Sequence, residues 1–132
     1  MEEFIDSVWR VKLPNKWQGE HSDECATFYH TDGVGALQIT TFEKEGEVQP
    51  EDLQMLADEL LTPEIEISEL RIGDFRGFSF ELEDDAECWR YWFVSAGEFA
   101  LAITYNCDIE DRDKEAGVVL EILRSLRVLI EE

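Results

Sequence analysis

Residues 65–107 read IEISELRIGDFRGFSFELEDDAECWRYWFVSAGEFALAITYNC, and this stretch decides the fold. Runs of β-branched and aromatic residues alternate in it with turn residues, which is typical of strands. The runs occupy positions 65–72, 75–82, 88–95 and 99–107. Their connections, such as Gly73-Asp74 and Gly97-Glu98, are short, and connections this short join antiparallel neighbours. The stretch therefore predicts a succession of antiparallel strands.

Further strands are expected before this stretch. Positions 7–13 alternate weakly and end at Pro14, which stops a strand. Positions 24–31 and 36–42 are rich in strand formers and flank the turn sequence Asp32-Gly33-Val34-Gly35. The first run therefore predicts a separate strand, and the other two predict a hairpin.

Two amphipathic stretches predict helices. Pro50 suits the first position of a helix, and Pro63 prevents its continuation. A second helix is expected over positions 110–129, with Asp108 as its N-cap. Each helix has one apolar stripe at helical spacing. The stripes consist of Leu53, Leu56, Ala57, Leu60 and Leu61 in the first helix and of Val119, Ile122, Leu123, Leu126 and Ile130 in the second.

The resulting order, β-β-β-α-β-β-β-β-α, predicts an α+β fold. Runs of strands separated by single helices are typical of largely antiparallel sheets. We expect a mostly antiparallel sheet of six to seven strands, packed with two helices. The length of 132 residues suits one domain, so positions 1–132 are predicted to form a single domain.

The net charge restricts the possible partners. The chain has 32 acidic and 11 basic residues, which give a net charge of −21. Nucleic-acid phosphate would be repelled, so nucleic-acid binding is not expected. Three interpretations of the charge stay open. It adapts the protein to a salty cytoplasm, it attracts a protein with a basic surface, or it imitates nucleic acid toward a nucleic-acid enzyme.

The amino-terminal residues MEEFIDSVWRV lack the basic and apolar stretches of a secretion signal. Every apolar run is too short to span a membrane, so we expect a cytoplasmic protein. Cys25, Cys88 and Cys107 are odd in number and lack metal-binding spacing. This argues against a disulfide framework or a structural zinc site. No metal and no cofactor are expected.

The chain opens with Trp9-x-Val11-x-Leu13-Pro14-x-x-Trp17 and closes with Ile122-Leu123-x-Ser125-Leu126. With the element order between them, this pattern resembles the PsbP-like fold family. The family includes the extrinsic photosystem protein, a Ran-binding nuclear import factor and small bacterial proteins, some of them chaperones for secreted toxins. The resemblance covers nearly the whole chain and implies binding or assembly of other proteins. Members share no single active site, so the resemblance implies no functional residue.

No catalytic site is predicted. The serines lack the Gly-x-Ser-x-Gly pattern of a hydrolase, and no glycine-rich phosphate loop precedes a helix. A pair of Cys107 with His21 or His30 would suit a nucleophile beside a helix start. Strand alternation instead places Cys107 among buried residues, with Leu101 and Ile103.

Alternation along the strands predicts an apolar and a mixed face of the sheet. The apolar set is Phe28, Leu37, Ile39, Phe78, Phe80, Leu101 and Ile103. The mixed set is Thr27, Tyr29, Gln38, Thr40, Ser79, Arg90, Trp92, Thr104 and Asn106. If both helices cover the apolar face, the mixed face stays open, and its composition is that of a protein-binding surface. Alternatively, segment 14–23 half covers it and Trp92 merely packs.

The sequence therefore favours a non-enzymatic protein-interaction domain, chaperone-like or immunity-like in role. Its partner-binding residues would be Tyr29, Arg90 and Trp92 as anchors, with Gln38, Thr40 and Asn106 supplying hydrogen bonds. The alternative is a small-molecule-binding protein or a minor enzyme, with a pocket near a loop at 14–23. The polar groups of that pocket would be Glu20, His21, His30 and Asp32.

Overall fold

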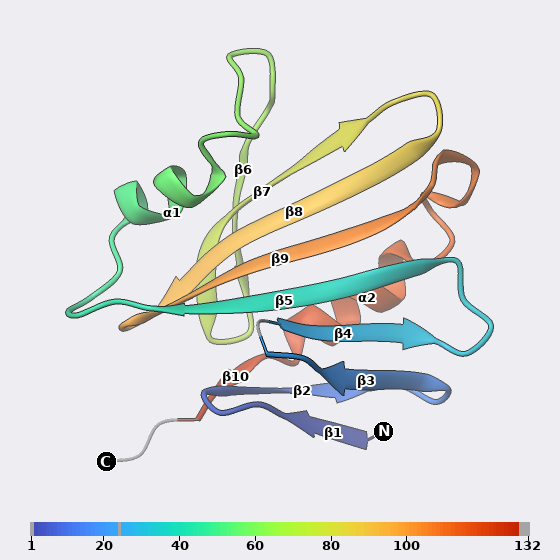
Figure 1. The fold of residues 1–132 in the computed structure, drawn as a ribbon, viewed down its shortest axis with the longest axis horizontal. Helices are drawn as coiled ribbons and strands as arrows, with labels where there is room; N and C mark the ends of the chain where they lie inside the picture. The colour runs from blue at the N-terminus through green and yellow to red at the C-terminus, as the bar shows by residue number, and fades with distance from the viewer. Residues whose placement is uncertain (1, 24, 130–132) are drawn as a thin grey trace.

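The computed structural model describes residues 2–23 and 25–129, and within them it has two antiparallel sheets and two α-helices (Figure 1). The α+β class, the antiparallel arrangement and the broad order of the elements are therefore confirmed. Two predicted positions, the strand start at Glu24 and the end of the second apolar stripe at Ile130, lie outside the described residues.

The larger sheet has seven strands in the order β3-β4-β5-β9-β8-β7-β6, and every neighbour is antiparallel. Its strands are β3 (Trp17–His21), β4 (Cys25–His30), β5 (Gly35–Glu43), β6 (Ser68–Ile72), β7 (Phe75–Glu83), β8 (Glu87–Ala96) and β9 (Phe99–Asp108). The predicted hairpin is β4 with β5, and the predicted succession after the first helix is β6 to β9. Strand β3 corrects the expectation of a loop over 14–23.

The smaller sheet joins the two ends of the described chain. Its order is β1-β2-β10, formed by β1 (Glu2–Ile5), β2 (Trp9–Leu13) and β10 (Arg127–Val128). Only β2 was expected. The strand β10 exists because the chain leaves the last helix and pairs with β2, and the Leu129 N–H extends this contact by donating to the Val8 carbonyl at 2.8 Å.

The last helix is shorter than the sequence suggested. Instead of one helix over 110–129, the structure has a 3-10 turn, η1 (Ile109–Asp111), and then α2 (Ala116–Arg124). Asp108 precedes η1 and not α2. After Arg124, the Ser125 hydroxyl donates a hydrogen bond to the Ile122 carbonyl at 2.5 Å. This carbonyl lies in the last turn of α2, where no following helical turn supplies a donor.

The two helices lie on opposite faces of the larger sheet. Helix α1 (Pro50–Ala57) begins where the Asp52 carboxylate accepts a hydrogen bond from the Gln49 N–H at 2.7 Å. It packs Leu53 and Ala57 on one face, whereas α2 packs its stripe on the other. The two helices therefore do not cover the same face of the larger sheet. The predicted open mixed face would have required that both cover the apolar face. Neither described helix is long and apolar enough to cross a bilayer.

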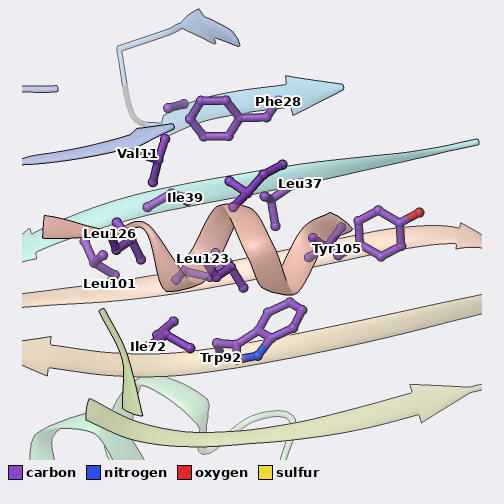
Figure 2. Close-up of a cluster of buried hydrophobic side chains, with 14 of the residues drawn as sticks. Val11, Phe28, Leu37, Ile39, Ile72, Trp92, Leu101, Tyr105, Leu123 and Leu126 are labelled. Atoms are coloured by element: carbon purple, nitrogen blue, oxygen red, sulfur yellow. The ribbon is translucent and has the colours of Figure 1, made fainter. Parts of the chain in front are cut away.

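The main core lies between one face of the larger sheet, helix α2 and the smaller sheet (Figure 2). Trp9 of the smaller sheet is fully buried in it, and its indole N–H donates to the Thr41 hydroxyl of β5 at 2.8 Å. Burying an aromatic side chain of this kind stabilises a fold by about 1.5–3 kcal/mol. The smaller sheet is therefore fixed to the larger one by packing and by a polar contact.

The turns at Gly73 and Gly97 give a matched pair of stability tests. Both glycines have positive φ, 59° and 58°. A Cβ on Gly73 would lie 1.9 Å from the Leu126 carbonyl oxygen, whereas a Cβ on Gly97 meets no atom within 4 Å. Gly97→Ala should lower the free energy of unfolding by about 1–2 kcal/mol, the cost of the backbone conformation alone.

Gly73→Ala should cost about 2 kcal/mol more, because the turn must also move away from the carbonyl that accepts from Asp74 N–H. Urea unfolding measures both values. Equal losses for the two variants would contradict the close approach of the β6–β7 turn to the end of α2.

Candidate functional site

The six residues predicted to bind a partner lie on opposite faces of the larger sheet. Directly opposite residues on antiparallel strands share a face. Trp92 lies opposite Ile103, and Arg90 lies opposite Tyr105, so both point to the side of the main core. The other four, Tyr29, Gln38, Thr40 and Asn106, alternate with core residues and point to the second face. The six residues therefore do not form one surface.

The misplacement of Arg90 and Trp92 has a physical cause. Helix α1 covers part of the second face, so β8 carries apolar residues on both sides, such as Trp92 on one and Phe93 on the other. Phe78 and Phe80, which alternation assigned to the main core, pack beside Leu53 of α1. Alternation alone cannot choose between two apolar sides of one strand. The two-residue turn Gly97-Glu98 was the usable signal, since it sets Ala96 opposite Phe99 and hence Trp92 opposite Ile103.

The uncovered part of the second face lies over β3, β4, β5 and β9, and we call it the open half-face. In Figure 1, α1 lies beside β6, β7 and β8, away from β4 and β5. The outward side chains of the open half-face are half-buried or exposed, among them Tyr29, Gln38, Thr40, Thr104 and Asn106. The Tyr29 hydroxyl donates to Gln18 Oε1 at 3.3 Å, and Gln38 Nε2 donates to the Thr27 hydroxyl at 3.4 Å. Cross-strand polar contacts therefore hold these side chains in place.

On the core side, Arg90 borders a hollow of about 450 Å³ between the sheet and helix α2. Its Nε donates to Glu81 Oε1 at 2.9 Å, and its Nη2 lies 3.6 Å from Asp113 Oδ1. The side chain of Arg90 is only 15% exposed, and Nη1 is buried without a hydrogen-bond partner among the described residues. The guanidinium is thus largely removed from water with part of its donor capacity unused.

Neighbouring carboxylates stabilise the charged form of Arg90. Burial acts to lower the pKa of Arg90, but the hydrogen bond to Glu81 and the charge of that carboxylate outweigh burial, so the pKa is raised. Glu81, Glu83 and Cys88 place ligand atoms within 4.8 Å of one another. Two of these groups contact arginines, since Arg90 Nε lies 2.9 Å from Glu81 Oε1 and Arg112 Nη1 lies 3.9 Å from Glu83 Oε1.

Cys88 and Cys107 lie directly opposite each other on β8 and β9, and both are buried. Burial raises the pKa of Cys88 from 9.0 to about 11, and Arg90 opposes this only in part. Burial also raises the pKa of Cys107. Thiols of this kind stay protonated at neutral pH and are poor nucleophiles. The predicted burial of Cys107 is confirmed, and neither thiol is activated.

The polar groups of the alternative pocket are not gathered around a loop. His21 ends β3 and stacks on Phe4 with ring centroids 4.5 Å apart. His30 packs edge-on against Trp17, and its Nδ1 accepts a hydrogen bond from the Asp32 N–H at 2.9 Å. The hollow beside His30 is bordered by residues of the β4–β5 turn and of β9, and it includes neither Glu20 nor His21.

Comparison with solved structures shows which fold this is. A protein of Bacteroides thetaiotaomicron VPI-5482 matches 98% of this chain with a TM-score of 0.73 at 17% identity. LpqN, involved in cell envelope biogenesis of Mycobacterium tuberculosis, matches 95% with a TM-score of 0.67 at 12% identity. Cyanobacterial PsbP (CyanoP) from Synechocystis sp. PCC 6803 matches 97% with a TM-score of 0.59 at 11% identity.

The chain has a PsbP-like fold. The match covers 92% of CyanoP and 87% of LpqN, but this chain spans only about half of the Bacteroides protein, 48% of its length. No family model and no curated protein matches the sequence. The resemblance expected from the opening and closing motifs is therefore confirmed at the level of the fold.

Within this PsbP-like fold, Trp92 should be a core residue. Its side chain is 5% exposed and belongs to the main core. Trp92→Ala should lower the free energy of unfolding by about 3–5 kcal/mol, because it leaves a large cavity. Gln38→Ala, on the open half-face, should change it by at most about 0.5 kcal/mol. Chemical denaturation of both variants tests the face assignment, and a cost for Trp92→Ala as small as that for Gln38→Ala would contradict it.

The buried thiol of Cys88 should make stability depend on pH in the alkaline range. The thiol titrates near pH 9.0 in the unfolded chain and near 11 in the folded one, so the folded state holds the proton more tightly. Its stabilising contribution is complete below pH 9.0 and falls by up to about 2–3 kcal/mol as pH rises to about 11.

Cys88→Ala should reduce this alkaline loss, measured as the difference between unfolding free energies below pH 9.0 and near pH 11. Cys25→Ala keeps the buried thiol pair and serves as the control, so it should retain the loss seen in the unmodified protein. An unchanged alkaline loss in Cys88→Ala would show that this thiol does not differ between the folded and unfolded states.

Proposed function

We propose that this chain is a non-enzymatic, cytoplasmic protein-interaction domain, chaperone-like or immunity-like in role. The observation that supports this most strongly is the open half-face, where polar and aromatic side chains of four strands adjoin without a covering helix among the described residues. Surfaces that combine tyrosine with amide and hydroxyl groups on a rigid sheet suit protein recognition.

The proposed contact residues differ in their roles. Tyr29 is the aromatic anchor. Its hydroxyl already donates a hydrogen bond to Gln18, so the side chain is partly ordered and loses less conformational entropy when a partner binds. The side chains of Thr40 and Asn106 make no hydrogen bond with other described residues, so their polar groups are available to a partner. Gln38 is exposed at the centre of this group, opposite Thr27 on one strand and Thr104 on the other.

The proposed partner is a protein with a basic surface. The net charge of the chain is −21, and no outward side chain of the open half-face is basic among the described residues. Such a charge attracts a positively charged protein over long distances and accelerates its association. At physiological ionic strength the attraction is screened beyond about 8 Å, so side-chain contacts on the open half-face must then fix the complex.

Charge-matched variants test this function. The double variant Gln38→Arg with Asn106→Arg places positive charge on the open half-face. The control variant Glu51→Gln with Met55→Arg makes the same change in net charge on α1, where both side chains are exposed. Each immobilised protein would be exposed to host lysate, and retained proteins would be quantified by mass spectrometry at low and high salt.

The expected result is one basic protein that the unmodified chain and the α1 control retain in near-stoichiometric amount. The open half-face variant should retain it at least about tenfold less, the loss expected when repulsion and two lost hydrogen bonds combine. Retention by all three proteins alike, or by none of them, would contradict the proposal.

A further inference from the structure

We propose that the hollow beside Arg90 binds a small, uncharged organic molecule that has a carbonyl oxygen and an apolar body. This hollow lies on the core side of the larger sheet, so the proposal is independent of the protein partner on the open half-face. Its volume of about 450 Å³ lies within the range of small-molecule sites.

The floor of the hollow offers unused hydrogen-bond donors in one row. Ser68 of β6 lies opposite Ser79 of β7, and Ser79 lies opposite Trp92 of β8, so the three side chains share a face. Neither serine hydroxyl makes a hydrogen bond with another described residue, and both line the hollow. Arg90 lies in the next row, opposite Glu81 and two residues from Trp92 on the same face of β8. Two hydroxyl groups and a guanidinium thus border the same hollow, where they could donate to a ligand oxygen.

The guanidinium of Arg90 has donors to spare. Only Nε makes a hydrogen bond within the described chain, to Glu81. The contact of Nη2 with Asp113 is 3.6 Å long, and the Asp113 side chain is 83% exposed, so this carboxylate is readily exchanged for a ligand oxygen. Nη1 also has no partner among the described residues, but it is shielded from solvent, so Nη2 is the donor that a ligand oxygen would meet in this proposal.

The local charge decides between a neutral and an anionic ligand. One guanidinium is surrounded by the carboxylates of Glu81 and Asp113, and Glu66 also lines the hollow. A ligand carboxylate would add a further negative charge in a partly desolvated place, where like charges repel more strongly than in water. A neutral carbonyl oxygen accepts the same hydrogen bonds without this repulsion.

The rest of the lining is apolar. Trp92 lies on the sheet side, Val119 and Leu120 on the helix side, and Leu70 at the β6 side. A flexible or ring-shaped hydrocarbon body between these side chains would gain the free energy of leaving water. The proposed ligand class is therefore a small amide, ester or ketone with an apolar body.

Octanamide and octanoate are suitable probes, because they share an apolar chain and differ in the charge of the head group. Each would be titrated into the full-length chain at neutral pH. Binding would be followed by the NMR signals of the Trp92 indole N–H and the Arg90 Nε–H. Octanamide should shift both signals, and octanoate should bind at least about tenfold more weakly.

Two variants locate the binding without removing Arg90, whose loss would leave Glu81 without its partner. Leu120→Trp, on the half-buried side of α2, should fill the hollow and abolish octanamide binding. Met55→Trp adds the same side chain on the exposed side of α1 and should leave binding unchanged. Ser79→Ala should weaken octanamide binding about three- to tenfold, the effect of one lost hydrogen bond.

Three results would overturn the proposal. Tighter binding of octanoate than of octanamide would show that the local charge does not select a neutral ligand. Octanamide binding that survives Leu120→Trp would place the ligand elsewhere. No shift of the Trp92 or Arg90 signals with either probe would show that the hollow holds solvent only.

Discussion

The two-residue turn at Gly97-Glu98 is the constraint on which the rest of the structure depends. It fixes the register of β8 with β9, and a slip of one residue would move every side chain of β8 to the other face. With the observed register, Trp92 enters the main core, Arg90 reaches Glu81 beside the hollow, and Cys88 meets Cys107. The same register sends Tyr91 and Phe93 toward α1, which gives this short helix an apolar surface to cover.

Much of the architecture could be predicted because local signals agreed with the final packing. The Asp32-Gly33 turn between two strand-forming runs and the proline at the start of α1 both hold in the structure. The face of β8 could not be predicted from alternation, because both sides of this strand carry apolar side chains that are covered. Strand β10 was missed since residues 127 and 128 continue a helical pattern, and only pairing with β2 ends it. Of the six candidate contact residues, four share one face, as alternation indicated, and their role in binding stays a prediction.

The two faces of the larger sheet are covered to different extents. One face is closed by α2 and the smaller sheet, and it retains a hollow where a largely buried arginine keeps unused donors. The other face is covered by α1 over β7, β8 and the start of β9, so β3, β4, β5 and the rest of β9 present mostly polar side chains to solvent. The proposed protein partner and the proposed small ligand therefore use opposite faces of one sheet.

The most direct test of this account is the register of β8 with β9 in solution. The Ile109 N–H donates to the Ala86 carbonyl, and hydrogen-bonded pairs alternate along an antiparallel ladder, so Tyr91 and Thr104 form a non-hydrogen-bonded pair. The Hα atoms of such a pair approach closely, and the account predicts a strong nuclear Overhauser effect between the Hα atoms of Tyr91 and Thr104. A strong effect from Tyr91 to Ile103 or Tyr105 instead would mean a shifted register, with Trp92 and Arg90 on the open half-face, and would contradict the account.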